Sequence, residues 1–229
     1  MDKTAIRNAA TVVVLRKTAE QTFVLMGQRG EKAAFMPNKY VFPGGAVDPQ
    51  DYHITLASEI AEPCLSRLAD DSDPSLVHPL SVAAIRELWE ETGLILGKRA
   101  DWHDTPPEDW TEFANRGYVP DASALKFVFR AITPPGRPRR FDARFFVIDA
   151  SALSGDIDDF SSASDELSHL SWIPVEDVRN YNLPFITEVV LAEVMRHNAP
   201  STAPSTVPFF KNDEEANLFL HLNGHPQPD

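Results

Sequence analysis

The sequence contains a single cysteine, Cys64, among its 229 residues. An intrachain disulfide is therefore excluded, and we expect a reducing, cytoplasmic setting. No run approaches the roughly 20 consecutive apolar residues that span a bilayer. The first residues also lack the charged start, apolar stretch and cleavage site of a secretory signal peptide. We therefore expect no membrane association.

Basic residues are scarce, because 21 Lys and Arg stand against 34 Asp and Glu, for a net charge of −13. Such a charge repels nucleic acid backbones and anionic membrane surfaces, so we expect no nucleic acid partner. An anionic small molecule is also repelled unless a cation or a local basic cluster reverses the field. One such cluster is present in Arg137, Arg139 and Arg140.

Apolar residues, 43% of the chain, are arranged in short β-branched or aromatic runs and in two longer helical patterns. The runs predict strands near residues 9–15, 23–26, 40–42, 125–132, 141–148 and 170–173. The helical patterns cover residues 80–92 and 186–196, and a further helix is expected at 213–222. Strands and helices interleave without regular βα alternation, which indicates a mixed sheet flanked by helices, an α+β (α/β/α) sandwich.

The segment 80–93, LSVAAIRELWEETG, predicts a helix that ends at Gly93. Its apolar side chains fall on one side, whereas Glu87, Glu90 and Glu91 cluster on the other with i, i+3, i+4 spacing. One interpretation is a solvated acidic face, which is the usual place of a charge run. The other is a site for a hard divalent cation, which prefers carboxylate oxygens.

A turn earlier in the chain favours the cation site. Phe42-Pro43-Gly44-Gly45 places two glycines after a short strand. Glycine lets the backbone approach another group closely or adopt positive φ, although such a turn alone is more often only a turn.

Together these segments resemble the Nudix hydrolase superfamily, whose signature is G-x5-E-x7-R-E-U-x-E-E-x-G-U, with U a bulky apolar residue. Its first part begins at Gly45, and its second part is matched by Arg86, Glu87, Leu88, Glu90, Glu91, Gly93 and Leu94. The resemblance implies a Nudix-type mixed sheet flanked by helices, formed by a single domain over residues 1–229. An insertion at about 52–79 and a C-terminal helical extension at about 184–222 complete this expected organisation.

The sequence departs from the signature at two points. Asp51 stands where the family has its first Glu, a residue that mainly braces the loop by pairing with the helix Arg. The shorter Asp51 is expected to take this role, alone or with Asp48. In addition, residues 52–85 separate Asp51 from Arg86 where the signature has only seven residues, so a helical insertion interrupts the motif. Long insertions cost little free energy.

The resemblance implies metal-dependent hydrolysis of a phosphoanhydride in a nucleoside diphosphate linked to another moiety. Glu87, Glu90 and Glu91 would hold Mg²⁺, or Mn²⁺, and Arg86 would orient these carboxylates. Gly44 and Gly45 would offer backbone groups to the metal and the substrate. A cation suits this chemistry, because a diphosphate needs charge neutralisation and in-line positioning.

A further acid is suggested by family members that carry a Glu six residues before a Trp at the start of the last strand. Glu166 stands six residues before Trp172 in this sequence. By this resemblance Glu166 is the general base or an additional metal ligand. The alternative is that Asp165 and Glu166 form an exposed loop pair or a helix cap.

The substrate side resembles the branch that includes the peroxisomal coenzyme A diphosphatases. Arg29 stands thirteen residues before Phe42, where the coenzyme A signature has an Arg, but the second Arg and the Gly of that signature are replaced by Ala34 and Asn38. Coenzyme A or a related nucleotide is thus one hypothesis. Arg29, Arg139 and Arg140 are candidate phosphate contacts, with ordinary surface charge as the alternative.

Two further alternatives remain open from the sequence. The chain could be a non-catalytic nucleotide sensor that keeps the fold, although all three helix carboxylates are retained. Residues 101–121, with Trp102, Trp110 and Tyr118, could stack on a nucleobase, or serve together with the C-terminal segment mainly as a homodimer interface. We favour a third interpretation, in which these aromatic side chains pack the excursion against the core.

Overall fold

The computed structural model describes residues 5–33, 35–197, 203–212 and 217–223. The strands are β1 (Ile6–Lys17), β2 (Thr22–Arg29), β3 (Tyr40–Val41), β4 (Gly44–Ala46), β5 (Gly97–Arg99), β6 (Tyr118–Pro120), β7 (Lys126–Ile132), β8 (Arg140–Asp149), β9 (Leu167–Pro174), β10 (Val207–Asn212) and β11 (Asn217–Leu222). The α-helices are α1 (Cys64–Ala69), α2 (Val77–Thr92), α3 (Thr111–Asn115) and α4 (Phe185–Arg196). Five short 3-10 helices are η1 (Pro49–Tyr52), η2 (Pro74–Leu76), η3 (Glu108–Trp110), η4 (Ala150–Ala152) and η5 (Val175–Asn180).

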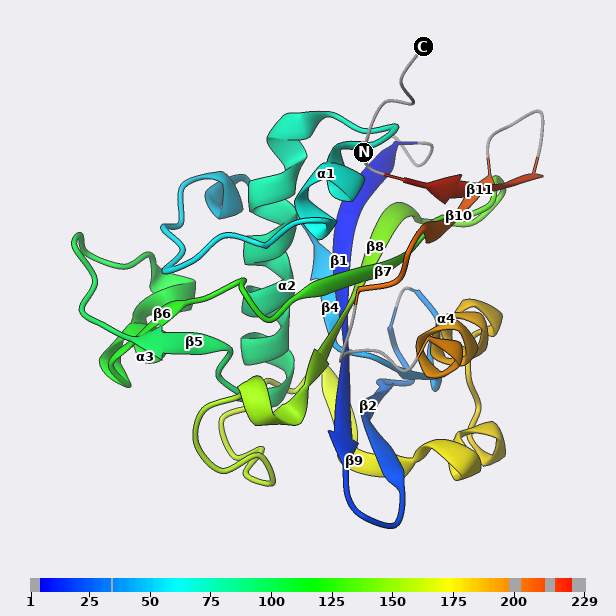
Figure 1. The fold of residues 1–229 in the computed structure, drawn as a ribbon. Coiled ribbons are helices and arrows are strands. Elements are labelled where there is room, and N and C mark those ends of the chain that lie inside the picture. Colours follow the sequence, from blue (N-terminus) through cyan, green and yellow to red (C-terminus); the bar gives the residue numbers. More distant parts are fainter. Residues whose placement is uncertain (1–4, 34, 198–202, 213–216, 224–229) are drawn as a thin grey trace.

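A nine-stranded mixed sheet forms the centre of the molecule. Its strand order is β11-β10-β7-β8-β1-β2-β3, with β4 also paired to β1 and β9 paired to β2. Helix α2 lies against one face of this sheet and α4 against the other (Figure 1). The expected α+β sandwich with a mixed sheet is therefore confirmed.

The central strand β1 explains why both faces of the sheet need covering. Val12 and Val14 belong to the apolar cluster that includes α2, whereas Val13 and Leu15 belong to the cluster that includes α4. Successive side chains of a strand point to opposite faces. All four of these side chains are fully buried, so the near-continuous apolar run reflects a strand with a core on each side.

Helix α2 ends where the sequence predicted. Gly93 adopts φ 73° and donates its N–H to the carbonyl of Trp89, 2.7 Å away. This left-handed residue closes the helix in the manner that favours glycine. The start of α2 is set by η2, where the Asp73 carboxylate accepts the Ser75 N–H at 2.9 Å.

The insertion between η1 and α2 is fastened to the sheet by buried arginines. Arg130 on β7 pairs with Asp142 and donates to the Asp71 carbonyl, while Arg144 on β8 donates to the Ser72 hydroxyl. The insertion includes the short helix α1, and α2 begins before the insertion's expected end at residue 79.

The excursion at residues 101–121 packs onto α2, as we favoured from the sequence. Trp110 is 1% exposed and its ring lies 5.2 Å from that of Phe113, which in turn contacts Trp89 on α2. Trp102 donates its indole N–H to the Tyr118 carbonyl at 2.7 Å. These aromatic side chains are therefore part of the core packing.

The expected helical extension at about 184–222 is correct only for α4. Beyond it, β10 pairs in parallel with β7, and β11 pairs antiparallel with β10. The helix expected at 213–222 is therefore wrong where the structure describes that segment, since 217–222 is β11 and 213–216 lie outside the described residues. Strand β10 buries Phe209 completely against the sheet and supplies hydrogen-bond partners to the edge of β7.

Among the described residues, no helix combines the length and the apolar character that a membrane span requires.

Candidate active site

The two glycines of β4 bring the backbone into direct contact with α2. A Cβ built at Gly45 would overlap the Glu87 carboxylate, and one at Gly44 would meet the Thr11 Cα at 2.7 Å. Both glycines are thus required for close approach, the first of the two uses that the sequence left open. The Pro-Gly-Gly turn and the acidic face of α2 form one site.

Glu91 is the most enclosed of the three glutamates, with 1% of its surface exposed. Its Oε2 accepts the Gly44 N–H at 2.7 Å, whereas its Oε1 is buried with no hydrogen-bond partner. Burial raises the pKa of Glu91 well above its usual range, and the neighbouring charge of Glu87 adds to the rise. Carboxylate oxygens are rarely left in this condition without a ligand or a specific function.

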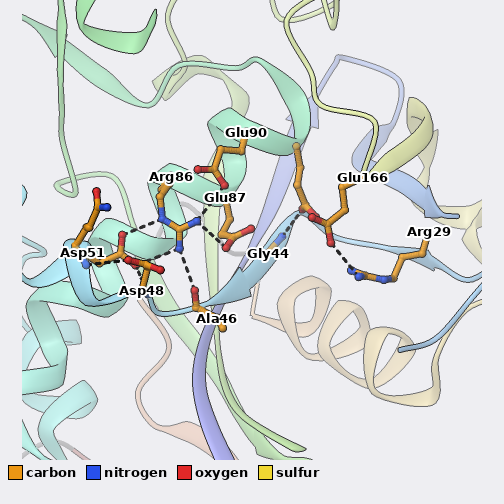
Figure 2. A network of polar contacts seen from close by, with 11 residues as sticks. Arg29, Gly44, Ala46, Asp48, Asp51, Arg86, Glu87, Glu90 and Glu166 are labelled. Carbon is orange, nitrogen blue, oxygen red and sulfur yellow. Dashed lines mark hydrogen bonds and ion pairs between the residues drawn. The ribbon is translucent and has the colours of Figure 1, made fainter. Parts of the chain in front are cut away.

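Arg86 forms hydrogen bonds with the other two glutamates, Glu87 and Glu90. One of its terminal nitrogens donates to Glu87 Oε1 at 2.9 Å and to Glu90 Oε2 at 3.0 Å (Figure 2). Burial raises the pKa of Glu87 to about 7, although the charge of Arg86 opposes this shift. Burial also raises the pKa of Glu90, again against the effect of Arg86. The burial of Glu87 argues against a solvated acidic face, whereas Glu90 stays partly exposed, with 32% of its side chain accessible.

Asp51 completes the brace around Arg86. Its two oxygens accept from the Arg86 Nε at 2.9 Å and from a terminal nitrogen at 3.1 Å, and Asp51 is fully buried. Asp48 takes a different part, because its carboxylate caps η1 by accepting the Gln50 N–H at 2.9 Å. The Asp48 N–H in turn donates to Asp51 at 2.8 Å, which fixes the acid toward Arg86. The shorter side chain thus reaches Arg86 because η1 carries it inward.

Known proteins resemble this chain over most of its length. No family model matches it. A putative nudix hydrolase 7 of Caenorhabditis elegans is 29% identical over 179 residues, 73% of this chain and 51% of the relative. The acyl-coenzyme A diphosphatase NUDT19 of Xenopus laevis is 25% identical over 209 residues, 69% of this chain and 54% of the relative. The chain thus spans about half the length of the curated relatives it matches.

A solved structure decides the family. The crystal structure of a NUDIX hydrolase from Alicyclobacillus acidocaldarius is 30% identical and superposes with a TM-score of 0.64, covering 87% of this chain and 97% of that one. The chain belongs to the Nudix hydrolase family. The expected membership is confirmed.

In this Nudix hydrolase, Glu166 and Arg29 lie beside the glutamate cluster and contact each other. A terminal nitrogen of Arg29 donates to Glu166 Oε1 at 3.0 Å. Figure 2 shows this pair on the side of Gly44 that faces away from Arg86. The charge of Glu166 contributes to the raised pKa of both Glu87 and Glu91, after the larger effect of burial. Glu166 and Arg29 therefore form part of the site's electrostatics.

Arg139 and Arg140, the two candidate phosphate contacts where the β7–β8 connection enters β8, are not brought to the glutamates. Arg140 is 7% exposed and donates to the carbonyls of Thr133 and Asn212, which joins β10 to this turn. On β8, Arg140 pairs with Ile6 of β1, whereas Gly45 on β4 pairs with Ala10 of β1. Arg140 and Gly45 therefore lie at different points along β1. Because its guanidinium is buried and engaged, the expectation that Arg140 grips phosphate is wrong. Arg139 is exposed in the same turn.

The donor set fits a divalent cation. Within the described ranges, no group of three or more His, Cys, Asp or Glu side chains is arranged so that these side chains alone could hold a metal ion. Mg²⁺ does not need such a group, because it usually keeps several waters and takes one or two carboxylates together with substrate phosphates. Glu91 Oε1 is unpartnered, and Arg86 engages only one oxygen each of Glu87 and Glu90. Oxygens from all three glutamates therefore remain for a hard cation such as Mg²⁺ or Mn²⁺.

One neighbour of the site was not identified from the sequence. The charge of Asp109 on η3 contributes to the raised pKa of Glu90, after burial and against Arg86. Asp109 stands in the excursion that packs onto α2, nineteen residues after Glu90. No periodicity or motif marks it, so only the packing of η3 reveals its proximity.

Proposed function

We propose that this protein hydrolyses a phosphoanhydride bond in a nucleoside diphosphate linked to another moiety, in a reaction that depends on Mg²⁺ or Mn²⁺. The observation that carries the proposal is the buried, unpartnered Oε1 of Glu91 beside Glu87 and the Gly44–Gly45 backbone. Burying such carboxylates is costly unless a cation compensates them. Their raised pKa values express that cost.

The proposed roles follow from the contacts of each residue. Glu87, Glu90 and Glu91 would hold the cation, which when bound supplies neutralisation of the diphosphate and activation of water. Arg86 keeps Glu87 and Glu90 pointing outward from α2, and Asp51 keeps Arg86 in place. Gly44 and Gly45 would offer backbone groups to the substrate, because without side chains this part of β4 lies directly against Thr11 and Glu87.

Glu166 is proposed as the general base. Water attacks one phosphorus, the bridging P–O bond breaks, and the second phosphate leaves with the bonding electron pair. The Glu166 carboxylate takes the proton from the attacking water. Its position beside Glu91 supports this role, as does an exposed fraction of 54% for its side chain, which allows the proton to pass on to solvent.

Coenzyme A or a related nucleotide is the proposed substrate class. Support comes from Arg29, which keeps the first basic position of the coenzyme A signature and lies at the site. The similarity to NUDT19, named as an acyl-coenzyme A diphosphatase, supports the same class. Ala34 and Asn38 depart from that signature, so the panel of test substrates must extend beyond coenzyme A.

A product-resolved hydrolysis screen tests this proposal. Coenzyme A, ADP-ribose and diadenosine polyphosphates are incubated with the protein and Mg²⁺, and products are identified by mass spectrometry. Coenzyme A should yield 3′,5′-ADP and phosphopantetheine, and Glu90→Gln should abolish this product. Glu20→Gln, an exposed change in the β1–β2 turn, serves as the matched control. Binding without product across the panel would instead support the nucleotide sensor.

The cellular setting and partners are part of the same proposal. The net charge of −13 supports a small-molecule partner over nucleic acid, because the phosphate backbone would be repelled. The single cysteine supports a reducing compartment such as the cytoplasm. Light scattering decides between a monomer of 25.5 kDa and a homodimer.

A further inference from the structure

The contact between Arg29 and Glu166 joins two residues that catalysis would use separately. Arg29 is proposed to bind phosphate, and Glu166 is proposed to take a proton, yet their side chains are paired at 3.0 Å. The Arg29 Nε also donates to the Phe35 carbonyl at 3.1 Å. While these contacts persist, Glu166 Oε1 and one terminal nitrogen of Arg29 are engaged with each other and not with a water or a substrate.

The ion pair is held in place but is open to exchange. The exposed fraction is 19% for the Arg29 side chain and 54% for the Glu166 side chain. A half-exposed pair contributes little stability, so a stronger partner can replace either member at little cost. A diphosphate is such a partner for Arg29, since guanidinium binds phosphate oxygens bidentately through charge-assisted hydrogen bonds.

The local backbone places Glu166 against the site. Strand β9 begins at Leu167, and its pairing with β2 shifts register between Met26 and Gln28. Opposite this shift His169 adopts φ 53°, a conformation that is uncommon for a non-glycine residue. Bulges of this kind re-aim neighbouring side chains and are frequent beside active sites.

Gly27 allows this irregular pairing. A Cβ at Gly27 would lie 2.9 Å from Leu167 Cβ, so the absence of a side chain lets the start of β9 approach β2. Arg29 pairs with Leu167 in the same register. The two strands thus carry Arg29 and Glu166 to one point at the edge of the glutamate cluster.

We propose that Arg29 is a substrate-operated latch on Glu166. Without substrate, the Arg29 guanidinium holds the Glu166 carboxylate aside. When a diphosphate binds, Arg29 turns to its oxygens, and Glu166 is released toward the cation and the attacking water. Arg29 is then a positioning residue for Glu166 as well as a substrate contact. This inference rests on the proposed function, because it assigns the trigger to a diphosphate.

Magnesium binding without substrate tests the latch independently of turnover. Four proteins are compared by titration calorimetry, namely wild type, Arg29→Gln, Glu166→Gln and the double variant. Release of Glu166 in Arg29→Gln should tighten Mg²⁺ binding about threefold to tenfold, because a fourth carboxylate then approaches the cation. In the Glu166→Gln background the same substitution should change affinity much less, leaving a clear coupling in the cycle.

Arg16→Gln is the matched control, because it also removes one positive charge and one ion pair to the segment that precedes β9. Arg16 pairs with Asp158 at 2.8 Å on the segment that leads to Glu166, but it does not contact Glu166. Its removal should leave Mg²⁺ affinity within about twofold of wild type. Equal tightening by Arg29→Gln in both backgrounds would overturn the latch, since only long-range charge would then be acting.

Kinetics supply the second readout where a substrate is found. The loss in Arg29→Gln should fall mainly on KM, and the loss in Glu166→Gln mainly on kcat. Arg29→Lys should recover part of the KM effect, because an ammonium binds phosphate as a point charge without the bidentate geometry. Hydrolysis by the wild type together with absent coupling in the magnesium cycle would overturn the latch alone. Coupling without any hydrolysis would overturn the proposed function and the diphosphate trigger with it, and would leave only the effect of the Arg29–Glu166 contact on metal binding.

Discussion

Asp51 and Arg86 lie 35 positions apart in the sequence and form a buried, two-pronged ion pair with contacts of 2.9 and 3.1 Å. The insertion lies between these two residues in the sequence. The later part of the insertion is anchored to β7 and β8 through Arg130 and Arg144. The two parts of the interrupted motif thus meet in space, because the capped 3-10 helix η1 places the Asp51 carboxylate against Arg86.

Replacing Asp51 should destabilise the fold. Asp51→Asn leaves the fully buried site without its negative charge, and breaking a buried pair costs about 3 kcal/mol or more. Asp48→Asn is the matched control in the same turn, because Asn keeps an oxygen to accept the Gln50 N–H. Urea denaturation measures both. A loss below about 1 kcal/mol for Asp51→Asn would contradict the bracing role.

A methyl group at Gly45 should disable the site. Gly45→Ala places a Cβ on the Glu87 carboxylate, so Glu87 must leave its place beside Arg86. We expect activity to fall by about 10²-fold, a typical cost of misplacing a catalytic group. Gly30→Ala is the control, because a Cβ there meets nothing within 4 Å. Circular dichroism confirms that both variants fold. Full activity in Gly45→Ala would rule out the close approach as a requirement.

Magnesium should stabilise the protein more at higher pH. Burial raises the pKa of Glu87 to about 7, above its unfolded value of 4.5. In metal-free protein this group therefore contributes stability below pH ~4.5 that is lost as pH rises through about 7. A cation must displace the same proton, so its affinity increases over that range. Melting temperatures with EDTA and with Mg²⁺ should diverge from pH 6 to pH 8. A constant difference would count against Glu87 as a ligand.

Glu166→Gln should lower kcat by about 10²-fold or more, since general base catalysis contributes roughly that factor. Asp165→Asn is the control, because Asp165 is the exposed neighbour that the sequence could confuse with Glu166. Both variants are assayed across pH with the best substrate of the screen. Wild-type turnover of Glu166→Gln at every pH would remove Glu166 as the base.

The sequence predicted the parts of the site that lie close together along the chain. Glu87, Glu90 and Glu91 share one helical face, and helix periodicity is a strong local signal. Gly93 ends α2 as expected, because this helix end depends on a local property, the left-handed backbone conformation that glycine adopts readily. The Gly44–Gly45 turn was ambiguous alone, and its use became clear only against Glu87.

The parts that were missed depend on contacts between distant segments. Arg140 looked like a member of a surface cluster, but the pairing of β10 buries it. Residues 217–222 were expected to be helical, whereas they form β11 beside β10, and β10 is itself placed by its pairing with the distant strand β7. The contact between Arg29 and Glu166 spans 137 positions, and no local pattern encodes it.

The most direct test of the glutamate site is phosphorus NMR of a hydrolysed substrate, recorded with Mg²⁺ and with EDTA. The wild type should convert the diphosphate signals into two phosphomonoester signals only with Mg²⁺. Glu87→Gln, Glu90→Gln and Glu91→Gln should each slow this conversion by at least about 10²-fold while remaining folded. Equal conversion in EDTA, or in all three folded variants, would contradict the account.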